Sequence, residues 1–208
     1  GWSTYFTGSN YLSTDNTISM TGNFTIESYV MFDPGMTGST DGAIFTIGDN
    51  IANANSLELR VYGGFRIYIN GVNGAIQTNT TFTPNVWYHV AYTRSNGVMT
   101  LWWNGTSIGT YTNSVTISGK VHVGSPVLGW DSAALRGRLS NFRIVNGTAL
   151  YTSTFTPPTS QLTAVTNTIL LTCQSNRFID NSTTNSTFTS HGTPTIQPCN
   201  PFTPALYY

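Results

Sequence analysis

The sequence has 208 residues, of which 39% are hydrophobic and only 8% are charged, and its eight basic and eight acidic side chains cancel. A chain without a basic excess offers no stripe of positive charge to nucleic acid, and no apolar run approaches the roughly 20 residues that span a bilayer. The length and the hydrophobic content fit one large domain with a substantial core. The neutral surface favours an extracellular protein, on a cell surface or a virion, that packs against its neighbours.

Strands are predicted along the whole chain. Between Phe24 and Phe32 apolar residues recur largely at every second position, with Thr25 and Glu27 on the opposite face, which is typical of a strand with one side in a core. No segment keeps an apolar period of 3.6 residues, so the prediction is an all-β chain. Further strands are predicted at residues 43–47, 56–62, 65–69, 107–111, 120–123, 138–145, 168–172 and 186–189.

The strongest local signal lies in residues 86–106. Two runs rich in aromatic and β-branched residues flank Ser95-Asn96-Gly97, and a second Asn-Gly follows at Asn104-Gly105. Asn-Gly supplies the two positive φ angles of a type I′ turn, so the stretch predicts consecutive hairpins in an antiparallel sheet.

Prolines divide the chain into two parts. The stretch from Thr156 to Ser160 contains Pro157 and Pro158 and separates a main body, residues 1–160, from a C-terminal arm, residues 161–208. The arm carries the last two predicted strands and ends in a proline-rich stretch, which favours an extended path. It is interpreted as a strand-bearing extension of the body rather than as a second domain.

Four stretches resemble laminin-G-like domains, which are concanavalin-A-like sandwiches. Residues 1–12 resemble the opening strand of that family, residues 23–27 and 139–144 resemble later strands, and Trp87-Tyr88-His89 matches its Trp-x-His pattern. The resemblance implies a single antiparallel β-sandwich of jelly-roll type. It also implies a binding or structural module rather than an enzyme, with a structural hydrogen-bonding role for His89.

A second resemblance bears on the biological setting. Residues 143–158 and 171–182 are similar to sandwich modules in structural proteins of phages and microbes. Many relatives carry a segment like 168–189 ahead of the opening strand, whereas here it follows the body. The arm therefore closes the sheet either of its own chain or of a neighbouring copy, as in strand addition. We expect a self-associating subunit of a fibre or appendage, a homo-oligomer or filament.

Catalysis is not expected. Glycoside hydrolysis needs two carboxyl groups at one bond, but the two glutamates, Glu27 and Glu58, lie on separate predicted strands. The Glu-x-Asp-x-x-Glu cluster of sandwich glucanases is missing. The histidines His89, His122 and His191 are scattered without metal-type spacing, and no cofactor is required.

The alternative function is a carbohydrate-binding adhesin that recognises a surface glycan through its rim loops. Trp130-Asp131 and the pair Tyr68 and Asn70 each combine an aromatic ring with a polar side chain, although the simpler interpretation is that Trp130 fills the core or a subunit contact. Many relatives hold Ca²⁺ at the rim, and the candidate ligands here are Asp41, Asp49 and Asp131. An aspartate in a turn more often caps the backbone.

Two kinds of covalent modification are also possible from the sequence. Cys173 and Cys199 permit one disulfide, but Cys173 lies in an apolar strand, where a buried free thiol is the simpler interpretation. Six Asn-x-Ser/Thr triplets could carry glycans, at Asn23, Asn79, Asn104, Asn146, Asn181 and Asn185.

Overall fold

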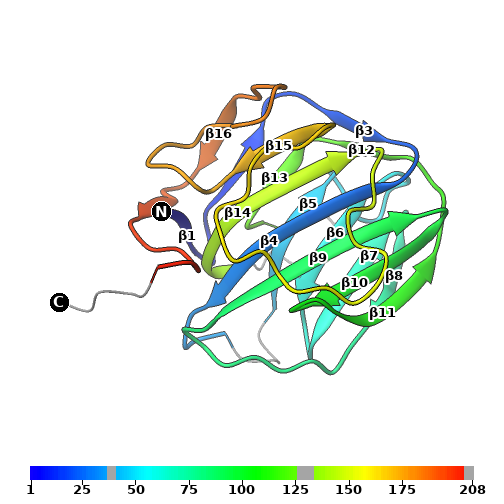
Figure 1. The fold of residues 1–208 in the computed structure, drawn as a ribbon, viewed down its shortest axis with the longest axis horizontal. Coiled ribbons are helices and arrows are strands. Elements are labelled where there is room, and N and C mark those ends of the chain that lie inside the picture. Colours follow the sequence, from blue (N-terminus) through cyan, green and yellow to red (C-terminus); the bar gives the residue numbers. More distant parts are fainter. Residues whose placement is uncertain (37–40, 126–133, 204–208) are drawn as a thin grey trace.

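The protein is a sandwich of two antiparallel β-sheets (Figure 1). The structure, a computed structural model, describes residues 1–36, 41–125 and 134–203. Those residues form strands and no helix, which confirms the all-β prediction. None of them belongs to a helix able to cross a membrane.

Each sheet has a simple neighbour order. The eight-stranded sheet runs β11 (Thr106–Thr112), β10 (Val98–Trp103), β9 (Trp87–Ser95), β4 (Phe24–Phe32), β14 (Arg136–Asn146), β1 (Ser3–Thr7) and β17 (Thr195–Gln197), and β15 (Thr168–Thr172) also pairs with β14. The seven-stranded sheet runs β16 (Phe188–His191), β2 (Tyr11–Thr14), β13 (Val121–Val123), β5 (Gly42–Ile47), β6 (Leu57–Val61), β7 (Phe65–Ile69) and β8 (Val72–Gln77). A two-stranded sheet of β12 (Ile117–Gly119) and β3 (Ile18–Met20) lies beside them.

The predicted hairpins form as the Asn-Gly turns require. Asn96 and Gly97 have φ angles of 50° and 80°, and Asn104 and Gly105 have 48° and 81°. The turns join β9 to β10 and β10 to β11, which pair as antiparallel neighbours. The local sequence therefore sets three neighbouring strands of the eight-stranded sheet.

The core lies between the two sheets. Alternation places Phe24, Ile26 and Val30 of β4 in this core. Phe142 of β14 meets Phe45 of β5 across the gap, with ring centroids 5.7 Å apart in an edge-on arrangement. Aromatic and aliphatic side chains of this kind supply most of the stabilising burial.

The C-terminal arm completes both sheets within the same chain. One side of β14 pairs with β4, and the other side is shared by β1 and β15. Where this side changes partner, Asn141 adopts a φ of 59°, its backbone N–H donates to Cys173 O, and its Oδ1 accepts from Leu162 N. Further along the arm, β16 pairs with β2 and β17 pairs with β1.

Apart from β1, which only the family resemblance predicts, five strands were not predicted: β2, β3, β8, β12 and β17. Four of them have three or four residues, too few for an alternating pattern to be recognised. The fifth, β8, is largely exposed and has only one buried residue, Ile76. Such strands are positioned by pairing with neighbours distant in sequence.

The disulfide that the sequence permits is not formed. Cys173 and Cys199 are both free thiols. Cys173 is buried, and burial raises the pKa of its thiol to about 12. Cys199 Sγ lies 3.2 Å from Ser3 Oγ instead.

Candidate functional site

A row of hydrogen-bonding side chains crosses the outer face of the seven-stranded sheet. Strand register places its members opposite one another on successive strands, because residues on one face of neighbouring strands align. At about 4.8 Å per strand, the six positions span about 24 Å. We call this set the outer row: Thr189, Ser13, His122, Thr46, Glu58 and Tyr68.

The middle of the outer row is closed and charged. Arg60 Nε lies 2.5 Å from Glu58 Oε1, and Arg60 Nη1 lies 3.0 Å from Asp41 Oδ2. Thr46 Oγ1 donates to Glu58 Oε2 at 2.7 Å, and it also lies 2.8 Å from Ser125 O. Glu58 and Arg60 are 0% and 1% exposed, so these groups hold one another rather than a ligand.

Burial raises the pKa of Glu58 to about 7, although Arg60 and Thr46 act in the opposite direction. Because the pKa of Glu58 is higher in the folded chain than in the unfolded chain, protonation of Glu58 stabilises the folded chain. Its contribution to stability is therefore complete below about pH 4.5 and is lost as the pH rises through 7. The difference between the folded and unfolded pKa of Glu58 corresponds to about 3 kcal/mol of stability at most.

Glu58→Gln is expected to remove this pH dependence. The free energy of unfolding, measured by urea titration from pH 5 to pH 8, should fall more steeply for the wild type than for the variant. Burial also lowers the pKa of His122, which adds a slope of opposite sign to both proteins. The difference between the two proteins is thus the quantity to compare, and equal slopes would contradict the assignment.

The end of the outer row near β16 is more open. His122 is 8% exposed, and neither of its ring nitrogens has a hydrogen-bond partner among the described residues. The nearest carboxylate oxygen, Asp49 Oδ1, lies 3.7 Å from His122 Nε2, beyond hydrogen-bond distance, on a side chain that is 82% exposed. Tyr11 and His191 stack beside it with ring centroids 4.1 Å apart, and Ser13 Oγ bonds His191 Nε2 at 2.9 Å.

The outer face of the eight-stranded sheet carries a sealed network instead. Glu27 Oε1 accepts from Arg143 Nε and Nη2 at 2.9 and 2.5 Å, and Glu27 Oε2 accepts from Tyr151 Oη at 2.8 Å and lies 3.0 Å from His89 Nε2. Burial disfavours the ionised form of Glu27, but His89 and Arg143 outweigh it and lower the pKa of Glu27. The predicted structural role of His89 agrees with this geometry.

Residues 147–167 cover this network, and we call them the covering segment. Figure 1 shows it passing across β4, β9 and β10. Phe155 N donates to Gly105 O at 3.1 Å, Tyr29 Oη donates to Pro158 O, and Arg143 Nη1 donates to Thr163 O at 2.8 Å. A Cβ atom on Gly105 would lie 1.8 Å from Phe155 O, so this turn needs glycine for the close approach.

The two glutamates therefore cannot act together on one glycosidic bond. Glu27 belongs to the outer face of one sheet and Glu58 to the outer face of the other, and stacked sheets are themselves about 10 Å apart. The two catalytic carboxyl groups of a glycosidase flank a single bond, and the distance between them is shorter than the distance between the outer faces of two stacked sheets. The glucanase arrangement is not built from these residues.

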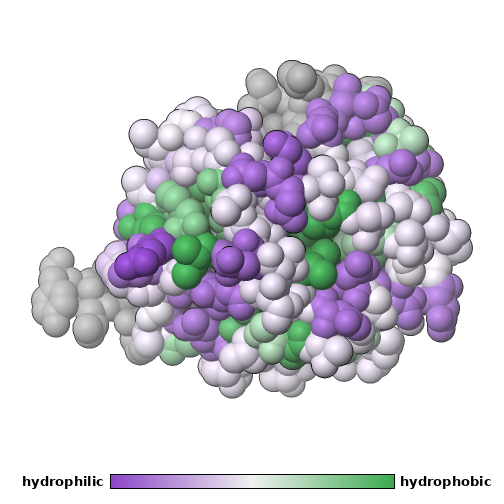
Figure 2. All heavy atoms as spheres, turned by 90° about the horizontal axis from the view of Figure 1, so that it is seen from above, coloured by the Kyte–Doolittle hydropathy of each residue, from purple (hydrophilic) through white to green (hydrophobic). Residues whose placement is uncertain are grey.

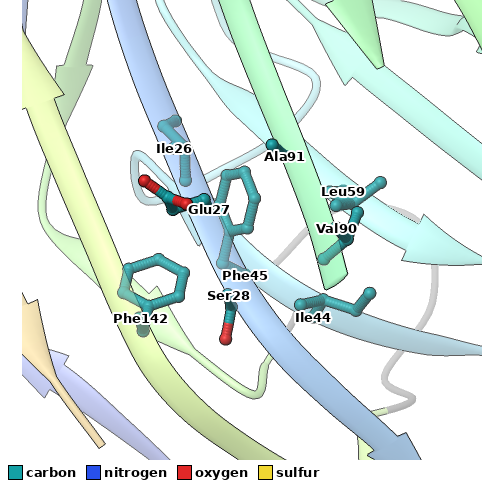
Figure 3. A pocket seen from close by; sticks show the side chains of 9 residues that line it. All are labelled: Ile26, Glu27, Ser28, Ile44, Phe45, Leu59, Val90, Ala91 and Phe142. Atoms are coloured by element: carbon teal, nitrogen blue, oxygen red, sulfur yellow. The ribbon is translucent and has the colours of Figure 1, made fainter. Parts of the chain in front are cut away.

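A pocket between the sheets, lined by described residues, has no room for a ligand either. Figure 3 shows a gap lined by side chains of β4, β5, β6, β9 and β14, with about 180 Å³ of empty volume, none of it wide enough for a water molecule. On the side shown in Figure 2, hydrophobic residues form small areas separated by pale and hydrophilic ones. Neither this gap nor the side shown in Figure 2 therefore offers a ligand a large apolar surface.

Several predicted site residues are engaged in internal contacts. Tyr68 is 6% exposed and lies with its ring 5.2 Å from the Arg60 guanidinium carbon, which leaves no open face for a sugar. Asn70 lies in a turn with a φ of 52°, and its Oδ1 accepts from Asn55 N. Trp130 and Asp131 lie outside the described residues.

Two of the three predicted calcium ligands make other contacts. Asp41 pairs with Arg60, and Asp49 lies beside His122. No group of three or more His, Cys, Asp or Glu side chains within these residues could hold a metal ion. The third predicted ligand, Asp131, falls outside them.

The predicted glycosylation triplets differ in accessibility. Asn23 and Asn146 are half-buried, and both make side-chain hydrogen bonds. Asn104 is exposed but accepts from His89 N through its Oδ1. Asn79, Asn181 and Asn185 are also exposed.

Comparison with known proteins gives one family match and many similar folds. The family model described as "Concanavalin A-like lectin/glucanases superfamily" matches residues 6–169. No curated protein matches the sequence.

Two solved structures resemble nearly the whole chain. A candidate carbohydrate-binding protein from Bacteroides ovatus aligns with a TM-score of 0.64 and 16% identity over 94% of this chain and 59% of its own. A heptameric SAP-like pentraxin from Limulus polyphemus aligns with a TM-score of 0.61 and 16% identity over 94% of each chain. The present chain thus spans about 59% of the Bacteroides protein, and likeness at this identity concerns the fold.

Proposed function

Because this chain belongs to the concanavalin A-like lectin/glucanase superfamily, we propose that it is an extracellular or cell-surface carbohydrate-binding module. Its ligand lies on the outer face of the seven-stranded sheet, at the open end of the outer row. The fold it shares with a candidate carbohydrate-binding protein supports this proposal over a fibre or virion subunit.

His122 is the observation that carries the proposal. A buried imidazole with two unsatisfied nitrogens is costly, because each buried polar atom without a partner loses about 1–3 kcal/mol of solvation. Both ring nitrogens are buried from solvent, so a ligand hydroxyl would enter where the exposed Asp49 side chain now lies, 3.7 Å from His122 Nε2, and would donate to one group and accept from the other. Sugars supply hydroxyls that donate and accept in this way.

The neighbouring side chains fit the same ligand. Tyr11 and His191 are half-buried, and their rings stack on each other. The exposed parts of these rings lie beside His122 and can contact the apolar face of a sugar. The exposed hydroxyl of Thr189 continues the row at its open end. An uncharged, extended oligosaccharide crossing β16, β2 and β13 would contact all of them.

A glycan array followed by titration calorimetry tests this assignment. His122→Ala is expected to weaken binding of the selected oligosaccharide by about tenfold or more, since one buried hydrogen-bond pair is lost. Asp49→Asn should weaken it less, because the amide keeps an acceptor and adds a donor. Ser107→Ala, on exposed β11 of the other sheet, is the control and should bind like the wild type.

Three outcomes would contradict the proposal. The first is an array without saturable binding. The second is binding that survives His122→Ala unchanged. Binding abolished by a calcium chelator would also move the site away from the outer row, toward a metal held with residues such as Asp131.

A further inference from the structure

A sandwich of open sheets has strand edges whose backbone N–H and C=O groups can pair with another chain, and these edges must be covered. The edges of β8 and β11 lie against each other at one end of the sandwich. The contact is tight, since a Cβ atom on Gly109 of β11 would lie 2.5 Å from Ile76 Cγ2 of β8. These two edges protect one another.

The edge of β15 is covered by the loop that follows it. Leu171 N donates to Asp180 Oδ1 at 2.9 Å, and Asn181 N donates to Leu171 O at 2.7 Å. Asp180 is itself fixed by Ser182 and Ser186, whose backbone N–H groups donate to its two carboxylate oxygens. This carboxylate substitutes for a missing neighbour strand.

Prolines protect the edge of β17. Gly8 N donates to Leu135 O, so even-numbered residues of β1 face β14 and odd-numbered ones face β17. Thr195 and Gln197 pair with Tyr5 and Ser3, hence face inward, and positions 194, 196 and 198 face outward. Two of those three are Pro194 and Pro198, which have no N–H to donate.

The edge of β16 has no such protection. Asp15 N donates to Thr187 O, so Thr187, Thr189 and His191 face β2, and Phe188 and Ser190 face outward. Nothing among the described residues pairs with that outward side. Residues 187–190 contain neither proline nor a charged side chain, the two usual means of blocking an edge.

We propose that a second copy of this chain pairs with β16, antiparallel and about a two-fold axis at Thr189. In that register Phe188 of one copy exchanges two hydrogen bonds with Ser190 of the other, and the reverse pair makes two more, because both residues face outward. Thr189 lies opposite itself, a favourable cross-strand pair. The seven-stranded sheets of the two copies become one continuous sheet. Because the chain has zero net charge, no net electrostatic repulsion opposes the approach of a second copy.

The occupant follows from self-complementarity. A two-fold axis requires the same surface on both partners, and a four-residue strand with alternate outward groups meets that condition without new side chains. The pairing does not rest on carbohydrate binding, because it depends on the outward backbone groups of Phe188 and Ser190; Thr189 is the one residue that the two proposals share.

Sedimentation velocity over a concentration series tests the pairing. The wild type is expected to move from 22.6 kDa toward twice that mass as its concentration rises. Ser190→Pro removes the outward N–H, leaves the N–H groups that face β2 in place, and should keep the chain monomeric. Ser190→Lys, a second variant in case proline unfolds the arm, should raise the dissociation constant by about tenfold or more.

Two controls isolate the edge. Ser190→Ala keeps the backbone N–H and should dimerise like the wild type, and Thr110→Lys adds the same charge on exposed β11 without effect. A wild type that stays monomeric throughout, or a dimer indifferent to both Ser190→Pro and Ser190→Lys, would overturn the proposal. If the wild type stays monomeric, the edge of β16 either binds an extended peptide or has no partner.

Discussion

Glu27→Gln is expected to lower the free energy of unfolding by about 3–5 kcal/mol, as breaking a buried ion pair usually does. The carboxylate is 1% exposed and is contacted by Arg143, His89 and Tyr151. A neutral amide leaves the Arg143 guanidinium buried without its counter-charge. The NH₂ group of the amide, itself a donor, would also face neighbouring groups that donate, so it could not form their hydrogen bonds. Urea titration followed by tryptophan fluorescence measures the loss.

The controls for this substitution separate charge from packing. The double variant Arg143→Gln, Glu27→Gln should lose less free energy of unfolding than the two single variants together. Each single change leaves one buried charge without its partner, and the double change removes both charges. The Glu27 contribution also depends on acidity, since its pKa is lowered in the folded chain. It is complete above about pH 4.5 and disappears as the pH falls. A loss below about 1 kcal/mol would place this network among ordinary surface pairs.

Arg94→Met is expected to destabilise the chain by about 3 kcal/mol, since three backbone carbonyls, of which that of Met20 is buried, lose a charged donor. Arg94 Nε and Nη1 donate to Gly22 O and Val115 O at 2.6 Å each, and Nη2 donates to Met20 O at 3.2 Å. These acceptors lie in or beside the small sheet of β3 and β12, so one guanidinium ties that sheet to β9. Methionine keeps the volume but none of the donors.

Hydrogen exchange shows where this loss falls. In Arg94→Met the amides of β3 and β12 should exchange much faster, while those of β5 and β6 change little. Arg94→Lys keeps the charge but not the three directed donors and should lie between the two proteins. Uniform loss of protection, or none, would contradict the local role of Arg94.

Local patterns predict those parts of the fold that depend on neighbouring residues. The Asn-Gly pairs fix two hairpins, and alternation from Phe24 to Phe32 identifies β4 with its inward face. The position of Glu27 on the opposite face is also correct. Its burial is not predictable from the strand, because the covering segment that seals it is placed by contacts with Gly105, Tyr29 and Thr25, which are distant in sequence.

The candidate site is harder to predict for the same reason. His122 belongs to a strand of three residues, and its neighbours on the outer face come from β2 and β5, far from it in the chain. Its significance becomes visible only once the register is known. Of the two aromatic and polar pairs that the sequence predicts as sugar platforms, Tyr68 is covered by Arg60 and Asn70 completes a turn, whereas Trp130 and Asp131 lie outside the described residues. A polar residue between apolar neighbours, as in Val121-His122-Val123, was the one available signal.

The most direct test maps a bound oligosaccharide on the isotope-labelled protein by amide chemical shifts. The ligand is the one selected on the glycan array. The proposed site predicts that the largest shifts, growing to saturation, fall on Tyr11, Ser13, His122 and Thr189. Shifts confined to the outer face of the eight-stranded sheet, or to the turn around Asn70, would contradict a binding site on the outer row.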